Sequence, residues 1–195
     1  MEKIKWGIIG PGNIANNFAD GLKGSYSGQL VSIASKSEDR RKKFGDKYDI
    51  HPDFRFDSYE DIINSEHIDA IYISTPHTLH AQWTIKAAGK GKHILCEKPG
   101  AINFNEGKKI IDAVREAGVF YMEGFMYRCH PQIPKLVDII KNKIIGDVIS
   151  IEASFGFDMG KTIPDHRLFN KNLAGGGILD VGLYPISFSR LIAGV

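Results

Sequence analysis

The fold is decided near the amino terminus by the stretch Ile4-Lys5-Trp6-Gly7-Ile8-Ile9-Gly10-Pro11-Gly12-Asn13-Ile14-Ala15. The apolar run over residues 4–9 predicts a strand, and the residues after it follow the pattern G-x-G-x-x-A. Gly10 permits a tight turn, Gly12 lets the backbone approach a pyrophosphate, and Ala15 keeps the next helix close to the strand. We expect that helix from Ile14 to about Lys23, with its first N–H groups facing the phosphates. A second strand, residues 29–35, completes a βαβ unit, which favours a dinucleotide site over an incidental tight turn.

The end of this second strand indicates which dinucleotide is bound. An NAD site usually carries an acidic residue there, whereas a 2′-phosphate requires positive charge. The strand instead ends in Ser35 and Lys36, and Arg40 and Arg41 follow one helical turn later. NADP is therefore favoured, and NAD remains possible. The alternative is that these cations belong to a solvated helix face, where Glu38 and Asp39 balance them.

The chain continues to alternate strands and helices as far as residue 123. Ser58 and Asp61 have capping-box spacing at the start of a helix, and a strand over residues 70–74 follows it. A helix to about Ala88, a strand before Glu97, a helix over about 106–117 and a strand over 119–122 complete the pattern. This order predicts an α/β fold, a doubly wound parallel sheet of the Rossmann type.

Two strand ends of this sheet carry polar residues. The first is followed by Thr75-Pro76-His77-Thr78-Leu79-His80, and the second by Glu97-Lys98-Pro99. Ligands of open α/β sheets bind at the carboxyl ends of the strands, so both segments are expected at the mouth of a site. The spacing of His77 and His80 also fits a metal, but no carboxylate or thiolate completes a ligand set. We therefore interpret this segment as a loop over the cofactor, with no metal.

The residues beyond Glu123 follow a different pattern. Phe125-Met126-Tyr127-Arg128-Cys129-His130-Pro131 is aromatic and basic, which suits either a wall for a nicotinamide or the core of a domain junction. We predict a helix over about 132–142 and a strand from Val148 to about Phe157. Three glycines, 175–177, then lead to a helix on which Asp180 and Tyr184 share one face. These elements predict the beginning of an α+β substrate domain over residues 124–195, after a dinucleotide-binding domain over residues 1–123.

Composition restricts the class of protein and its location. With 195 residues, 43% hydrophobic, and a formal charge of +2, the chain is typical of a globular protein that binds neither nucleic acid nor an anionic membrane. No apolar run is long enough to span a membrane, so we expect a cytoplasmic protein. Cys96 and Cys129 lie in apolar or aromatic surroundings without metal spacing, and we interpret both as reduced structural residues.

The ordered combination of the glycine pattern, Glu97-Lys98-Pro99, and Gly175-Gly176-Gly177 followed by Asp180 and Tyr184 resembles the glucose-fructose oxidoreductase/inositol dehydrogenase family (Gfo/Idh/MocA). The run from Glu123 to Pro131 is most similar to its dihydrodiol dehydrogenase and NADP-dependent D-xylose dehydrogenase branch. The resemblance implies hydride transfer between a nicotinamide and a sugar, polyol or cyclic diol. It also implies a homo-oligomer whose second domain continues well past residue 195, so that this chain carries an incomplete second domain.

The resemblance assigns catalytic roles to three residues. It places Lys98 against substrate and nicotinamide, makes Tyr184 the acid–base residue, and matches Asp180 to an acid of the inositol dehydrogenase branch. The ordinary pKa of a phenol is near 10, so a neighbouring ammonium such as that of Lys98 is needed to favour the phenolate. The expected cofactor-binding residues are Gly10, Gly12, Asn13, Ile14, Ser35, Lys36, Arg40, Thr75, Pro76, His77, His80, Glu97, Lys98 and Arg128.

Two other functions remain open at this point. One is a non-catalytic dinucleotide-binding regulatory module, or an inactive truncated relative. The other is a Rossmann protein whose ligand is not a nicotinamide. Titration with nicotinamide cofactors distinguishes the Rossmann protein with another ligand from the oxidoreductase and from the non-catalytic module.

Overall fold

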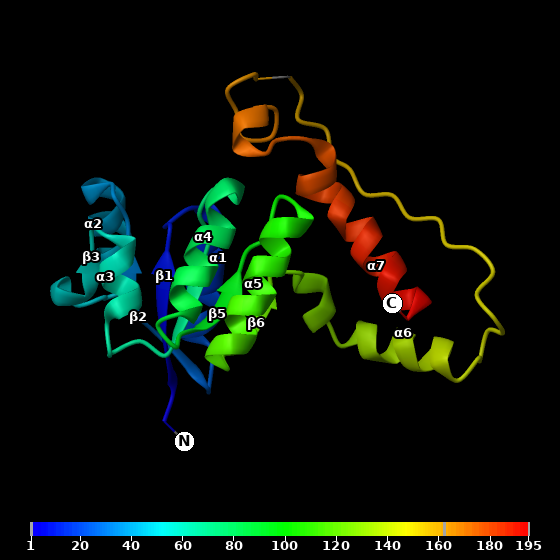
Figure 1. Ribbon diagram of the computed structural model, residues 1–195, viewed down its shortest axis with the longest axis horizontal. Helices are drawn as coiled ribbons and strands as arrows, with labels where there is room; N and C mark the ends of the chain where they lie inside the picture. The colour runs from blue at the N-terminus through cyan, green and yellow to red at the C-terminus, as the bar shows by residue number, and fades with distance from the viewer. Residues whose placement is uncertain (1, 162, 195) are drawn as a thin grey trace. The chain divides into compact units, whose positions relative to one another are not determined.

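The computed structural model describes residues 2–161 and 163–194 (Figure 1). The chain divides into two compact units, Met1–Gly124 (unit 1) and Phe125–Val195 (unit 2). Within the described residues, no helix is both long enough and apolar enough to cross a membrane.

Unit 1 is built on a six-stranded parallel sheet with the order β3-β2-β1-β4-β5-β6. The chain leaves β1 toward β2 and β3 on one side, then returns past β1 to β4, β5 and β6 on the other. The point of reversal lies between β1 and β4, where open α/β sheets bind their ligands. The strands are β1 (Ile4–Ile9), β2 (Gly28–Ala34), β3 (Arg55–Phe56), β4 (Ala70–Ile73), β5 (His93–Cys96) and β6 (Tyr121–Glu123). The predicted doubly wound fold is confirmed.

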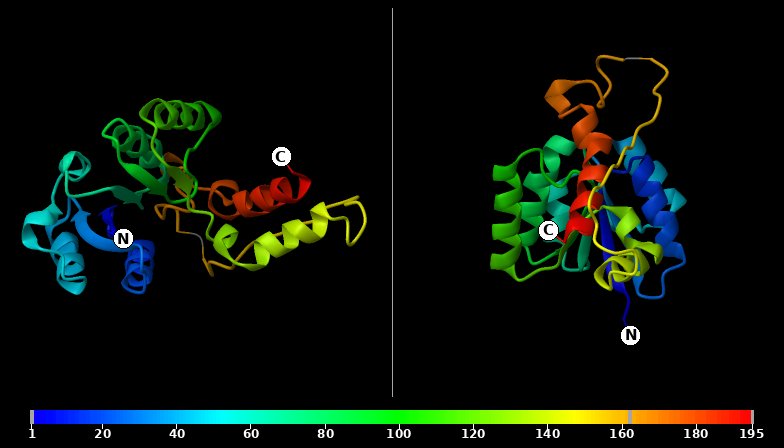
Figure 2. Two further views of the ribbon diagram at one scale, coloured as in Figure 1. Left: turned by 90° about the horizontal axis from the view of Figure 1, so that it is seen from below. Right: turned by 90° about the vertical axis from the view of Figure 1, so that its right-hand side faces the viewer.

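Helices cover both faces of this sheet (Figure 2). Side chains alternate between the faces along each strand, so Ile8 packs with helices α1 and α2, whereas Ile9 packs with α3, α4 and α5. Because both faces are buried, the central strand β4 is continuously apolar, and all four of its residues are buried. The helices are α1 (Asn13–Lys23), α2 (Glu38–Lys47), α3 (Tyr59–Asn64), α4 (His80–Ala88) and α5 (Phe104–Ala117).

Local sequence signals account for the helix ends. Ser58 caps α3, because its hydroxyl accepts hydrogen bonds from the backbone N–H groups of Glu60 and Asp61. Asn103 caps α5 in the same way, and Gly118 ends that helix in the left-handed region at φ 63°. The predicted start at Ser58 is confirmed, and α5 begins two residues earlier than predicted.

Unit 2 contains α6 (Gln132–Lys141), a π-helical turn (Ile178–Gly182) and α7 (Leu183–Ala193). The predicted strand from Val148 to about Phe157 is wrong, because this segment has no regular secondary structure. A strand requires a neighbour that satisfies its backbone groups, and the described part of unit 2 offers no other strand.

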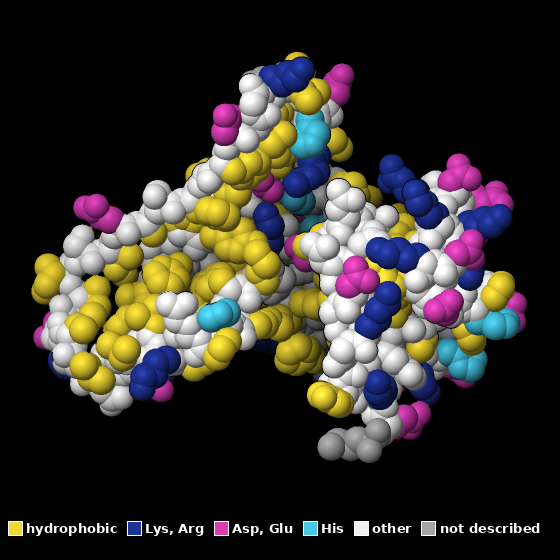
Figure 3. All heavy atoms as spheres, turned by 180° about the vertical axis from the view of Figure 1, so that it is seen from behind, with side chains coloured by type: hydrophobic (Ala, Val, Ile, Leu, Met, Phe, Trp, Pro, Cys, Tyr) yellow, Lys and Arg dark blue, Asp and Glu magenta, His cyan; other side chains and the backbone are white. Residues whose placement is uncertain are grey.

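Hydrophobic side chains gather on the surface of unit 2 (Figure 3). Ile149 is 92% exposed, and Ile144, Ile145, Phe155 and Phe157 are also exposed. None of the described hydrophobic residues of unit 2 is buried. This unit therefore does not enclose a hydrophobic core of its own.

Candidate functional site

The glycine loop between β1 and α1 has the geometry of a phosphate-binding loop. Gly10 has φ +92°, and a Cβ atom there would lie 3.0 Å from the carbonyl oxygen of Ser74. A side chain is thus excluded both by the backbone conformation and by the close approach of the end of β4. The Ser74 hydroxyl donates a hydrogen bond of 2.7 Å to the Gly10 carbonyl, which fixes the turn.

Gly12 keeps the other side of the loop open. A Cβ atom at this position would meet no atom within 4 Å, and no described side chain caps the start of α1. The first N–H groups of a helix lack intrahelical partners, so those of α1 remain available to an anion. Ala15 is fully buried, as its role beside the strand requires.

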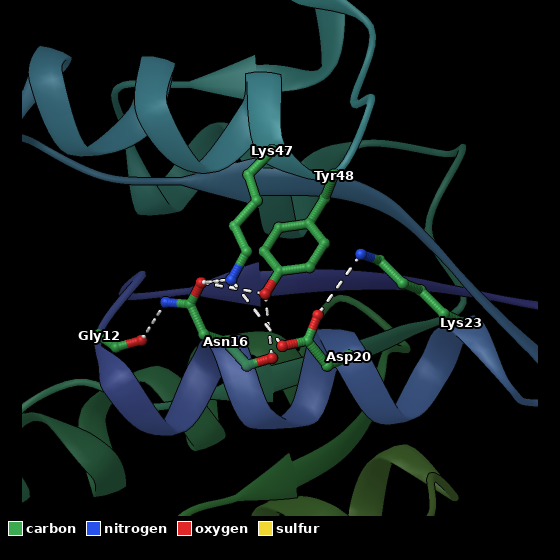
Figure 4. Close-up of polar contacts among 6 residues, drawn as sticks. All are labelled: Gly12, Asn16, Asp20, Lys23, Lys47 and Tyr48. Carbon is green, nitrogen blue, oxygen red and sulfur yellow. Dashed lines mark hydrogen bonds and ion pairs between the residues drawn. The ribbon is translucent and has the colours of Figure 1, made fainter.

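A polar network next to this loop joins α1 to the end of α2 (Figure 4). The Asn16 amide donates to the Gly12 carbonyl at 3.0 Å, and its Oδ1 accepts from Lys47 at 2.8 Å and from the Tyr48 hydroxyl at 3.0 Å. Asp20 adds ion pairs with Lys23 at 3.5 Å and with Lys47 at 3.8 Å. These residues belong to no binding motif, so sequence reasoning missed them, and only the packing of α2 beside α1 brings them together.

The end of β2 carries positive charge next to a tightly fixed serine. The Ser35 N–H donates to the Phe56 carbonyl at 3.0 Å, and the Ser35 carbonyl accepts from Arg41 at 2.6 Å. Arg41 is therefore engaged with the backbone, whereas Lys36 and Arg40 are exposed.

Tyr59 lies beside the two exposed cations. The Lys36 ammonium is 6.0 Å from the centre of the Tyr59 ring. Burial raises the pKa of Tyr59, and the charge of Arg40 partly opposes this rise. Positive charge therefore occupies the position at which an NAD-binding protein usually has an acid.

The loop after β4 contributes buried polar groups. Thr75 is 7% exposed, and its hydroxyl has no hydrogen-bond partner among the described residues. His77 is also buried, and its ring centre lies 5.8 Å from that of His80. Within the described residues, no group of three or more His, Cys, Asp or Glu side chains could hold a metal ion.

His80 does not lie on the surface of the site. Its ring is 0% exposed, and both ring nitrogens lie 2.7 Å from backbone carbonyl oxygens, those of Pro99 and Thr75. This arrangement leaves no ring nitrogen directed toward a cofactor.

The segment after β5 is held from neighbouring strands. The Tyr72 hydroxyl donates to Glu97 at 2.5 Å, and the Gly100 N–H donates to Glu123 at 2.7 Å. The peptide bond between Lys98 and Pro99 is cis. Burial, followed by the charge of Glu97, raises the pKa of Tyr72. The Glu97 carboxylate thus accepts a hydrogen bond from the neighbouring strand β4, and its predicted role in cofactor binding stays a prediction.

The remaining candidates lie in unit 2. Asp180 is buried in the π-helical turn and forms an ion pair of 3.3 Å with Arg167, a residue whose role the sequence did not reveal. The Tyr184 ring packs edge-to-face on Phe125 and Phe155, with ring centres at 5.6 and 5.2 Å. Arg128 is exposed, with its guanidinium carbon 6.0 Å from the centre of the Tyr127 ring.

The residues of unit 1 fit a dinucleotide. The open space at Gly12 suits a pyrophosphate. The Thr75 hydroxyl, which has no hydrogen-bond partner in the described part of the chain, lies where the end of β4 meets the glycine loop. A doubly wound sheet with such a loop defines a dinucleotide-binding protein.

The sequence comparisons identify the family. A model of the oxidoreductase family with the NAD-binding Rossmann fold (GFO_IDH_MocA) matches residues 4–125, and the chain belongs to this family. The predicted family is thus confirmed. The chain is 34% identical over 98% of its length to the trans-1,2-dihydrobenzene-1,2-diol dehydrogenase of Mus musculus, of which it covers 56%. It is also 34% identical over 98% of its length to the D-xylose 1-dehydrogenase (NADP(+)) 2 of Haloferax volcanii, of which it covers 58%. The chain therefore spans a little over half the length of these relatives.

Solved structures show the same likeness. The 3-ketoreductase KijD10 of Actinomadura kijaniata, in complex with NADP and TDP-benzene, aligns with a TM-score of 0.84 at 31% identity, covering 98% of this chain and 58% of that one. A putative NADPH-dependent oxidoreductase of Desulfitobacterium hafniense aligns with a TM-score of 0.90 at 28% identity, covering 100% of this chain and 56% of that one.

Proposed function

We propose that this chain is the cofactor-binding part of an NADP-dependent oxidoreductase that acts on a sugar, a polyol or a cyclic diol. The observation that carries the proposal is the combination of the glycine loop at Gly10 and Gly12 with two nearby cations. Lys36 follows the end of β2, where no acid is present, and Arg40 lies in the first turn of α2. The related xylose dehydrogenase uses NADP, and KijD10 was solved with NADP bound. Residues 1–123 would form the dinucleotide-binding domain, and residues 124–195 would begin the substrate and oligomerisation domain.

The cofactor residues divide by the part of the ligand that they would contact. The loop N–H groups of Gly12, Asn13 and Ile14 would bind the pyrophosphate, and Ser35, Lys36 and Arg40 would bind the 2′-phosphate. The Thr75 hydroxyl, with its neighbours Pro76 and His77, would line the path toward the nicotinamide, as would Arg128.

The bound nicotinamide supplies the hydride chemistry, so the protein has to orient the substrate and move one proton. We assign the proton transfer to Tyr184, which would exchange the hydroxyl proton of the substrate. Lys98 would bind the substrate hydroxyl and favour the phenolate of Tyr184 by its charge. Asp180 would orient the substrate, and its burial beside Arg167 keeps its carboxylate in one place.

The substrate class follows from the relatives, which act on a dihydrodiol and on D-xylose according to their names. A homo-oligomer and a cytoplasmic location remain predictions. A size measurement by light scattering on the purified protein tests the first. Microscopy of a tagged protein in its own cells tests the second.

Calorimetric titration of the chain with NADPH and NADH in parallel tests the proposed cofactor. We expect NADPH to bind at least about tenfold more tightly, since a charged contact to the 2′-phosphate contributes about 1.5–3 kcal/mol. Arg40→Ala should weaken NADPH binding by about tenfold or more and leave NADH binding unchanged. Lys42→Ala removes the same charge from another side of α2 and serves as the matched control.

Equal binding of the two cofactors would exclude the assignment of Lys36 and Arg40. Absence of binding to either would exclude the dinucleotide site itself. Where NADPH binds, turnover of sugars and diols by the native protein and by Tyr184→Phe tests the catalytic assignment. Binding without any turnover would favour the non-catalytic module.

A further inference from the structure

His80 occupies an unusual position for a histidine at the start of a helix. It begins α4, yet its side chain is 0% exposed. Nδ1 lies 2.7 Å from the Pro99 carbonyl oxygen and Nε2 lies 2.7 Å from the Thr75 carbonyl oxygen. Both distances are those of short, well-formed hydrogen bonds.

A carbonyl oxygen can only accept a hydrogen bond, so each of these contacts requires a donor on the ring. A neutral imidazole carries one N–H group. It would satisfy one carbonyl and direct a lone pair at the other, at a distance where two acceptors repel each other. The protonated ring carries an N–H on each nitrogen and satisfies both carbonyls at once.

We infer that His80 is a doubly protonated, positively charged clamp that joins the loop after β4 to the turn after β5 and so positions both for the cofactor and for Lys98. It is a positioning residue, because its buried ring acts through the two backbone segments. The part of this inference that concerns the cofactor rests on the proposed function, whereas the protonation state does not.

The two segments joined by His80 both carry candidate site residues. Thr75 supplies the buried hydroxyl beside the glycine loop, and Pro99 follows Lys98 directly. Independent contacts fix the same turn, because Tyr72 holds Glu97 and the Glu123 carboxylate accepts from the Gly100 N–H. Lys98 therefore lies in a turn whose backbone is held on both sides, and His80 links this turn to the neighbouring strand end.

The surroundings of the ring suit a cation. The turn that it contacts donates backbone hydrogen bonds to two carboxylates, that of Glu97 directly after β5 and that of Glu123 at the end of β6. The other titratable groups on the segments that surround the ring are His77 in the preceding turn, Lys98 directly before Pro99, and the Cys96 thiol at the end of β5. A buried charge is tolerated where hydrogen bonds replace water, and here a carbonyl oxygen lies within hydrogen-bond distance of each ring nitrogen.

Nuclear magnetic resonance of the native chain, labelled with ¹⁵N, tests the protonation state directly. In a two-bond ¹H–¹⁵N correlation spectrum at neutral pH, we expect both His80 nitrogens at the position of protonated imidazolium nitrogens. The assignment comes from the loss of this signal in His80→Asn. A spectrum in which one His80 nitrogen is unprotonated would overturn the inference.

Two substitutions test the positioning role, because each retains one of the contacts. The amide nitrogen of Asn lies near the position of Nδ1 and can reach Pro99, whereas that of Gln lies near Nε2 and can reach Thr75. We expect His80→Asn and His80→Gln each to weaken NADPH binding by about tenfold. Thr84→Val is the matched control, since Thr84 is a buried residue one turn further along α4 whose hydroxyl bonds to neither loop. It should change NADPH binding by less than about twofold.

The outcomes separate the inference from the proposed function. If the native chain binds no NADPH, the proposed function fails, and the resonance experiment still decides the state of His80. If the native chain binds NADPH and both His80 variants bind it equally well, the positioning role is wrong. If His80→Asn does not fold, as judged by circular dichroism, the loss of the signal in His80→Gln supplies the assignment, and the resonance experiment on the native chain still decides the protonation state of the ring.

Discussion

The hydrogen bond between Tyr72 and Glu97 makes a measurable contribution to stability, and Tyr72→Phe isolates it. The substitution removes the hydroxyl that donates to Glu97 at 2.5 Å and retains the ring. The ring keeps its stacking on Phe18, where the centres lie 4.1 Å apart at an interplanar angle of 23°. Any loss of stability therefore reports the hydroxyl alone.

The expected magnitude follows from burial. A hydrogen bond to a charged group contributes about 1.5–3 kcal/mol. Tyr72 is 2% exposed, so water does not reach its hydroxyl. Glu97 is only partly buried, so in the variant a water molecule can donate to its carboxylate in place of the lost hydroxyl. We therefore expect Tyr72→Phe to lower the free energy of unfolding by about 1.5–2 kcal/mol, in the lower half of that range.

Urea unfolding followed by fluorescence and circular dichroism measures this change. The midpoint should fall at an unchanged m value, because the substitution alters neither the native nor the unfolded surface. Tyr26→Phe is the control, since Tyr26 is 97% exposed and its substitution should change stability by less than about 0.5 kcal/mol. A loss in Tyr72→Phe no larger than that of Tyr26→Phe would refute the reasoning.

Two further predictions concern the glycine loop and alkaline pH. Gly10→Ala should cost about 2–4 kcal/mol and weaken NADPH binding, because an L-residue is strained at φ +92° and its Cβ would lie 3.0 Å from the Ser74 carbonyl oxygen. Gly21→Ala in α1 should instead stabilise by about 0.5–1 kcal/mol, since its Cβ meets nothing, and equal stability of the two variants in urea would contradict this account. Burial raises the pKa of Cys96 to about 12, so the native thiol keeps a proton that the unfolded chain loses above about pH 8.5. The free energy of unfolding of the native chain should therefore fall as pH rises from about 8.5, and this thiol contributes up to about 1.4 kcal/mol per pH unit. In Cys96→Ala the free energy of unfolding should stay constant to about pH 10. The same decline in that variant would assign the effect to another group.

Unit 1 was predictable from the sequence because its signals are local. The glycine pattern follows a strand and precedes a helix, and the Ser58 cap and the Gly118 end depend on residues within one helical turn. Continuous apolar strands between helices indicate a sheet covered on both faces. The order of the strands then follows from the limited number of ways in which such units connect.

The segment over residues 148–157 shows where local signals fail. Its residues have the composition of a strand, but a strand forms only beside another strand, and no local pattern reports whether a neighbour exists. The structure describes this segment without regular secondary structure.

The sequence by itself determined the doubly wound fold, the phosphate loop, the positive charge at the end of β2 and the family. Only the tertiary structure decided which side chains hold the site in place. Tyr72 and Glu97 are 25 residues apart, His80 and Pro99 are 19 apart, and Lys47 and Asn16 are 31 apart. The reason is physical: periodicity and capping are properties of neighbouring residues, whereas these contacts exist only after the sheet has brought the ends of its strands together.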